Sequence, residues 1–147
     1  IVLAGRRIND GFARWIAKEC TLELFRKRKG KNSYKALILG ITFKANCRDI
    51  RNSKSFELIN LLEKYGIDVF WHDPIFNSED INDLLNKKRV KNLFDLEEEY
   101  DLIIIAVGHS EYANLNSKEL EGFLKSPLIL YDIPGIIQKD YSNLIRP

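Results

Sequence analysis

The chain has 147 residues, of which 45% are hydrophobic and 30% charged, a composition typical of one compact globular domain and not of a disordered or collagenous segment. Its 23 basic residues nearly balance 21 acidic ones, which argues against a surface built mainly to bind nucleic acid. The longest apolar runs are far shorter than the ~20 residues that span a bilayer, and no secretory signal is visible, so we expect a cytoplasmic protein with no membrane partner.

The sequence contains no methionine and two cysteines. The absence of an initiating methionine predicts that the chain is a segment of a longer protein. Cys20 lies on an apolar helical stripe and is interpreted as a core residue. Neither Cys20 nor Cys47 has a partner cysteine or histidine at the spacing of metal ligands, so we expect no metal site and no disulfide framework.

The first expected element is a helix over about residues 9–29, because apolar residues recur along it at spacings of three and four. Its last turn, 26–29, is basic, and Gly30 follows as a candidate C-cap. We interpret the basic turn as a solvated helix end that complements the helix dipole. The alternative is a nucleic-acid patch that includes a second basic run at 87–91.

After Gly30, short apolar runs alternate with amphipathic segments, a pattern typical of βαβ units around a parallel sheet. The expected strands cover residues 35–39, 67–71, 102–107 and 128–131. Helices are expected at 54–64, more weakly at 79–86, briefly at 95–99 and around 120–124. We therefore predict an α/β fold, a Rossmann-like three-layer αβα sandwich with a mainly parallel sheet, preceded by the long N-terminal helix.

Polar residues follow the carboxyl ends of these strands, where open parallel sheets bind their ligands. The set consists of Gly40 with Lys44, then Asp73, then the Gly-His-Ser run that contains His109, then Asp132. A glycine turn, a lysine, an acid and a histidine suit a nucleotide site. The alternative is that these strand ends are polar for solubility alone.

The turn after the first strand departs from the dinucleotide-binding fingerprint. Gly40 is in place, but Thr42 and Ala45 stand where the second and third glycines belong, so we do not expect a standard NAD turn. Two cations, Lys44 and Arg51, follow instead, just before residues that can cap the next helix, Asn52 and Ser53. Cations beside a helix N-terminus favour an anion site. The alternatives are an exposed surface lysine and an arginine paired with Asp49 or Asp73.

The order of residues adds a resemblance. Residues 39–53 read Leu-Gly-Ile-Thr-Phe-Lys-Ala-Asn-Cys-Arg-Asp-Ile-Arg-Asn-Ser. This segment resembles the UDP-glucose/GDP-mannose dehydrogenase family at the start of its C-terminal domain, where Leu-Gly-x-x-Phe-Lys leads into Asp-x-Arg-x-Ser. The segments 4–11, 46–52 and 106–109 look most like the branch that acts on UDP-N-acetylhexosamines.

The resemblance implies an NAD-dependent oxidation of the C6 alcohol of a UDP-sugar to a carboxylate, which supplies uronic acids for capsule or O-antigen polysaccharides. Phe43 and Lys44 would contact the UDP-sugar substrate, and Arg51 would reach NAD across the cleft from an N-terminal NAD-binding domain of the same chain. Residues 1–30 would form the end of the central helix that joins the domains and builds a homodimer. Residues 31–147 would form the UDP-sugar-binding domain.

Two departures from the family limit this expectation. The catalytic cysteine of the family lies in a Gly-Gly-x-Cys segment upstream of Ala4, so we expect no catalytic residue and no activity in this segment alone. Residues 132–135 read Asp-Ile-Pro-Gly where the glucose branch has Asp-Gly-Arg-Arg, which disfavours UDP-glucose. A UDP-glucose 6-dehydrogenase and a non-catalytic nucleotide-binding module are the alternatives.

Overall fold

The computed structural model describes residues 8–76, 82, 88–95 and 98–147. Within this part, the fold is built on a five-stranded sheet with the strand order β2-β1-β3-β4-β5, in which every ladder is parallel. The strands are β1 (Tyr34–Leu39), β2 (Ile67–His72), β3 (Leu102–Ile105), β4 (Ile129–Asp132) and β5 (Leu144–Ile145). All residues of β3 and β4 are buried, as in parallel sheets covered on both faces.

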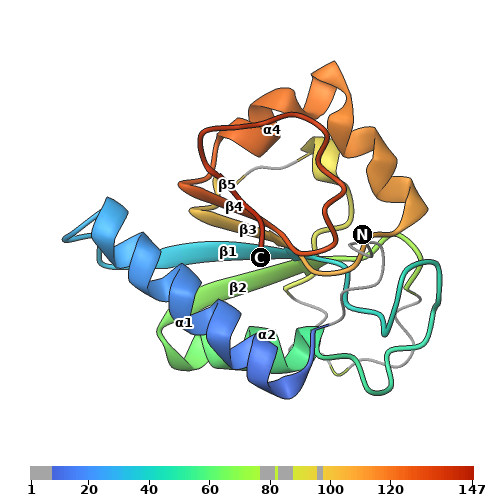
Figure 1. Cartoon of the computed structure of the whole chain (residues 1–147), viewed down its shortest axis with the longest axis horizontal. Coiled ribbons are helices and arrows are strands. Elements are labelled where there is room, and N and C mark those ends of the chain that lie inside the picture. The colour runs from blue at the N-terminus through green and yellow to red at the C-terminus, as the bar shows by residue number, and fades with distance from the viewer. Residues whose placement is uncertain (1–7, 77–81, 83–87, 96–97) are drawn as a thin grey trace.

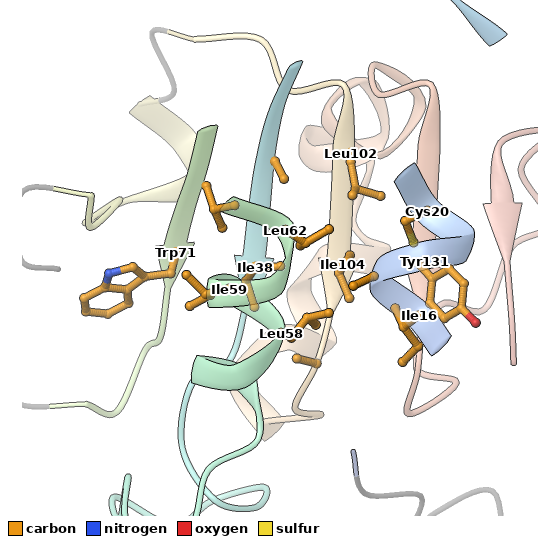
Figure 2. Close-up of a cluster of buried hydrophobic side chains, with 14 of the residues drawn as sticks. Ile16, Cys20, Ile38, Leu58, Ile59, Leu62, Trp71, Leu102, Ile104 and Tyr131 are labelled. Carbon is orange, nitrogen blue, oxygen red and sulfur yellow. The ribbon is translucent and has the colours of Figure 1, made fainter. Parts of the chain in front are cut away.

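Two helices, α1 (Asp10–Lys27) and α2 (Ser55–Lys64), pack side by side on one face of the sheet (Figure 1). Apolar residues spaced three and four apart on these helices meet alternate residues of the strands. Figure 2 shows this cluster, in which Cys20 of α1 lies near Tyr131 of β4. Cys20 is 2% exposed, which confirms that it is a core residue.

The first helix begins and ends close to its predicted bounds. The side-chain oxygen of Asn9 accepts a hydrogen bond from the Phe12 N–H at 2.8 Å and so caps the helix. Three large apolar side chains of α1 remain about half exposed, those of Trp15, Leu22 and Phe25. Among the described residues, no helix combines the length and apolar character needed to cross a bilayer.

Short helices cover the opposite face of the sheet, which completes the predicted three-layer αβα arrangement. They are η3 (Ser110–Asn116), η4 (Lys118–Leu120) and α4 (Glu121–Lys125). Because successive strand residues point to opposite faces, Ile104 packs under α1 and α2 while Ile103 and Ile105 pack under these short helices. The predicted fold class is therefore confirmed.

Some elements differ from the expectation. The strand predicted over 102–107 ends at Ile105, because Ala106 and Val107 both turn to donate their N–H groups to the Leu39 carbonyl. A single 3-10 turn, η2 (Leu93–Asp95), precedes the short helix expected at 95–99, of which residues 96 and 97 lie outside the described residues. The weak helix expected at 79–86 lies outside the described residues, apart from residue 82.

Candidate functional site

The carboxyl ends of β1, β2 and β3 meet at one edge of the sheet, and the 41–53 loop extends from this edge at the right of Figure 1. Asp73, which follows β2, lies at its centre and is 2% exposed. Its Oδ2 accepts hydrogen bonds from the N–H groups of Ile41 at 2.8 Å and Thr42 at 3.3 Å. Its Oδ1 accepts from two N–H groups of its own turn. One carboxylate thus holds two turns together.

These bonds bear on whether a dinucleotide fits the turn after β1. In a standard Rossmann turn the free N–H groups after the first strand face the pyrophosphate. Here the Asp73 carboxylate already occupies those of Ile41 and Thr42. The glycine at position 40 is explained by packing and not by phosphate binding, because a Cβ placed on it would lie 2.5 Å from the Val107 Cβ. NAD therefore does not fit this turn, in agreement with the missing glycines.

His109, which follows β3, is the second buried member of the site. Its Nε2 lies 3.0 Å from Asp73 Oδ2 and 3.0 Å from Thr42 Oγ1. Its Nδ1 accepts a hydrogen bond from the Asn46 N–H at 3.0 Å. Burial raises the pKa of Asp73, but hydrogen bonds from His109 and the backbone outweigh this effect and leave that pKa below its usual value.

Asn46 fastens the 41–53 loop to the end of β3. Its Oδ1 accepts hydrogen bonds from the Ser110 N–H at 2.9 Å and from the Ser110 hydroxyl at 3.0 Å. Its backbone has a φ of 58°, in the left-handed region that asparagine tolerates better than most residues. A second bond, from the Phe43 N–H to the Asp49 carbonyl at 2.7 Å, closes the base of the loop.

The predicted substrate residues lie in this closed loop. Phe43 is 36% exposed, a large fraction for an aromatic side chain. Lys44 is exposed and forms no ion pair with the described part of the chain. An exposed aromatic ring next to an uncompensated cation can bind a nucleotide through stacking and through charge.

The predicted cofactor residue, Arg51, pairs with Asp49. Its Nη2 lies 2.9 Å from Asp49 Oδ2, and its Nε also donates to the carboxylate. The hydrogen bonds lower the pKa of Asp49 and raise that of Arg51. The Arg51 side chain is 85% exposed, so the guanidinium keeps donors for an external anion. The salt-bridge alternative is thus confirmed for Asp49 and leaves room for the cofactor role.

The predicted capping of α2 is wrong in its details. The N-cap position is Lys54, which makes no side-chain capping bond. Ser53 Oγ instead accepts from the Ser55 N–H at 3.3 Å, while Asn52 has a φ of 61° and turns the chain into the helix. Ser53 therefore accepts a bond at the helix start as expected, but α2 begins at Ser55, one residue after the expected start at residue 54.

Asp132 does not share contacts with the other strand-end residues. Its Oδ1 accepts from the N–H groups of Gly135 and Ile136, and its Oδ2 accepts from that of Ile137 at 2.8 Å. The carboxylate is fully buried and is used by its own turn. Its place at the end of β4 predicted a site residue, but the structure shows an acid that shapes the turn beside Gly108.

A second buried histidine, His72, lies under η3. Its Nδ1 is 3.1 Å from the hydroxyl of Tyr112, which donates in turn to the His72 carbonyl at 2.9 Å. Burial lowers the pKa of His72 to about 4; the Asp73 charge opposes this shift, and Arg89 and His109 add to it. Burial also raises the pKa of Tyr112. Both groups are therefore neutral at physiological pH.

We expect the stability of the chain to depend on His72 in mild acid. Between pH 6.5 and about pH 4 the unfolded chain binds a proton at this position that the folded chain does not, so the free energy of unfolding falls as the pH is lowered through that window. The loss reaches about 3 kcal/mol. In His72→Asn, which keeps a donor for Tyr112, urea unfolding at neutral pH and near pH 4 should show a smaller difference. An unchanged difference contradicts the assignment.

The two cysteines lie in different environments. Cys20 is buried under α1, and burial together with Glu19 and Glu23 raises the pKa of its thiol. Cys47 is partly exposed in the 41–53 loop. No cluster of three or more metal-binding side chains occurs among the described residues.

Comparisons with known proteins agree with this arrangement. Residues 37–139 match the UDP-binding domain of the UDP-glucose/GDP-mannose dehydrogenase family. The UDP-N-acetyl-D-glucosamine 6-dehydrogenases of Salmonella typhi and Pseudomonas aeruginosa are 32% and 33% identical to this chain, over 98% of its length. The chain spans about a third of their length, 33% and 34% respectively.

The fold has a counterpart among solved structures. The UDP-N-acetyl-mannosamine dehydrogenase Cap5O from Staphylococcus aureus superposes with a TM-score of 0.69 over 94% of this chain and 30% of its own, at 18% identity. The same family is supported by the parallel sheet, by the loop after β1 and by the matched residues. The chain belongs to the UDP-glucose/GDP-mannose dehydrogenase family, of which it represents the UDP-binding domain.

Proposed function

We propose that this chain is the C-terminal part of an NAD-dependent dehydrogenase that oxidises the C6 alcohol of a UDP-N-acetylhexosamine to the uronic acid, for capsule or O-antigen polysaccharides. The observation that carries the proposal is the 41–53 loop, fastened over the edge of the sheet with Phe43 and Lys44 exposed. The two relatives that match 98% of this chain are both named UDP-N-acetyl-D-glucosamine 6-dehydrogenase, which supports the reaction class and a hexosamine substrate.

In this proposal the chain binds and does not perform the bond-making step. Lys44 holds the UDP-sugar by charge, and the Phe43 ring supplies an apolar surface beside it. Arg51, paired with Asp49 and exposed, reaches toward NAD held by an N-terminal domain of the same chain. The cofactor supplies hydride acceptance there. The buried Cys20 is no nucleophile, and Cys47 lacks the Gly-Gly-x-Cys context of the family, which supports a catalytic cysteine located outside these residues.

The contact partner of α1 is also part of the proposal. Trp15, Leu22 and Phe25 are exposed at 47%, 55% and 46% along this helix. Apolar side chains of this size and exposure support a contact with the rest of a longer chain or with a second copy in a homodimer. Sedimentation equilibrium of the longer protein distinguishes a dimer from a monomer.

A UDP-glucose 6-dehydrogenase is the competing assignment, and the turn after β4 argues against it. The resemblance places the substrate arginine of the glucose branch in this turn, and residues 132–137 contain no arginine. The turn is also fixed, because Asp132 binds three of its N–H groups. NADH formation by the longer protein with a panel of UDP-sugars tests the choice. Turnover of UDP-glucose without turnover of UDP-N-acetylhexosamines contradicts the proposal.

Two substitutions in the longer protein test the residue roles. Lys44→Ala should raise the KM for the UDP-sugar about tenfold or more with little change for NAD, because a charge-assisted contact is lost. Arg51→Ala should instead raise the KM for NAD about tenfold or more, with little change in the KM for the UDP-sugar. Lys64→Ala, an exposed lysine at the far end of α2, and Arg48→Ala, an exposed arginine of the same loop, are the matched controls. If the controls and the two test variants behave alike, the residue roles are wrong.

A further inference from the structure

The 41–53 loop is held by a side chain from another strand end, and that side chain does not reach the surface. His109 follows β3. Its Nε2 contacts Asp73, and its Nδ1 accepts a hydrogen bond from the Asn46 N–H. The His109 side chain is 0% exposed, so it cannot touch a ligand that binds outside the loop. We propose that His109 is a positioning residue that sets the shape in which the loop presents Phe43 and Lys44.

The bonds of His109 require one arrangement of its protons. The Asn46 N–H can only donate, so Nδ1 of His109 must carry a lone pair. The ring proton then resides on Nε2 and points at Asp73 Oδ2, with the Thr42 hydroxyl oxygen beside it. This assignment follows from the hydrogen-bond partners. A neutral imidazole with its proton on Nε2 satisfies every contact at once.

The anchors lie on both sides of the exposed pair. Thr42, just before Phe43, is held by Asp73 and lies against His109. Asn46, two residues after Lys44, is held by His109 and by Ser110. Phe43 and Lys44 therefore sit on a short span whose two ends are both fixed to one imidazole ring. Asp73 holds the Thr42 N–H without the ring, so the Asn46 end is the one whose release changes where the aromatic ring and the ammonium group point.

The role of His109 in ligand affinity rests on the proposed function, whereas its hold on the loop does not. Two conservative variants test the contacts of its two ring nitrogens separately. In His109→Asn, the amide oxygen can replace Nδ1 and accept from Asn46, while the bond to Asp73 is lost. In His109→Gln, the amide nitrogen can replace Nε2 and donate to Asp73, while the Asn46 N–H is left without its acceptor. His109→Asn thus loses the Nε2 contacts with Asp73 and Thr42, and His109→Gln loses the Nδ1 bond with Asn46, from the same buried position.

Tryptic cleavage of the 147-residue chain reads out the loop directly, because Lys44 and Arg48 are exposed cleavage sites within it. We expect His109→Gln to speed cleavage at these two sites about tenfold, since one buried hydrogen bond stops holding the loop closed. His109→Asn should stay near the wild-type rate. Urea midpoints of the two variants should be similar, so that a general loss of stability does not explain the difference.

Calorimetric titration with UDP supplies the second readout. His109→Gln should bind UDP about tenfold more weakly, and His109→Asn should bind it nearly as wild type does. Equal loop cleavage in the two variants, or unchanged cleavage in His109→Gln, overturns the positioning role. If the wild-type chain binds no UDP while the cleavage pattern appears as expected, the proposed function fails and the hold of His109 on the loop stands.

Discussion

Gly40→Ala is expected to destabilise the chain by about 2–5 kcal/mol. Gly40 has a φ of 94°, where an L-residue costs about 1–2 kcal/mol. A Cβ at this position would also lie 2.5 Å from the Val107 Cβ and 2.9 Å from the Val107 N, and such overpacking costs another ~1–3 kcal/mol. Val107 cannot move away freely, because its N–H donates to the Leu39 carbonyl.

Gly66→Ala is the matched control for this prediction. Gly66 has a φ of 85° after α2, but a Cβ on it would meet nothing within 4 Å. The control therefore carries the conformational cost without the clash. Urea unfolding of both variants should show a clearly lower midpoint for Gly40→Ala. Equal midpoints mean that the contact with Val107 yields at little cost and that Gly40 is explained by its backbone angle alone.

The sheet was predictable because its strands are defined by local patterns. The continuous apolar run of β3 and the alternation in β2 identify strands that are buried on two faces and on one, respectively. β5 was missed, since it is two residues long and only half buried, with no periodicity to detect. The helix η3 was missed because its polar residues mask the two buried positions that anchor it, Tyr112 and Leu115.

The buried part of the site was predictable only in its strand-end residues. Asp73 and His109 were found because each follows a strand, and the parallel sheet brings these ends together. The roles of Thr42 and Asn46 were not foreseen, since they depend on how the loop after β1 folds back onto the end of β3. The available signal was the asparagine at position 46, because this residue type tolerates a left-handed φ and has a side chain that can bind a neighbouring turn.

Arg51 shows how a local contact and a proposed function can coexist. Its bond to Asp49, two residues earlier, is visible in the sequence as a short-range pair and was weighed there. The Arg51 side chain is 85% exposed, so the pair contributes little to stability, and the guanidinium stays at the surface, where an external anion can reach it. The sequence fingerprint places both residues in the same element, Asp-x-Arg-x-Ser.

Asp73→Asn should be the most damaging conservative change at the site, with a loss of about 2–6 kcal/mol. Oδ2 accepts from three donors and Oδ1 from two, so an amide in either orientation turns its NH₂ group toward at least two buried donors. Each donor left without an acceptor costs ~1–3 kcal/mol. The loop should open as well, because the anchor of Thr42 depends on this carboxylate.

Asp132→Asn is the control, since it is also a buried acid at a strand end that binds a turn. Two N–H groups point at its Oδ1 and one at its Oδ2, so an amide can keep two bonds and lose one, at a cost of about 1–3 kcal/mol. Urea unfolding should rank Asp73→Asn below Asp132→Asn, and trypsin should cut after Lys44 or Arg48 faster in Asp73→Asn alone. If Asp132→Asn costs as much or opens the loop equally, Asp73 does not hold the two turns together as the geometry requires.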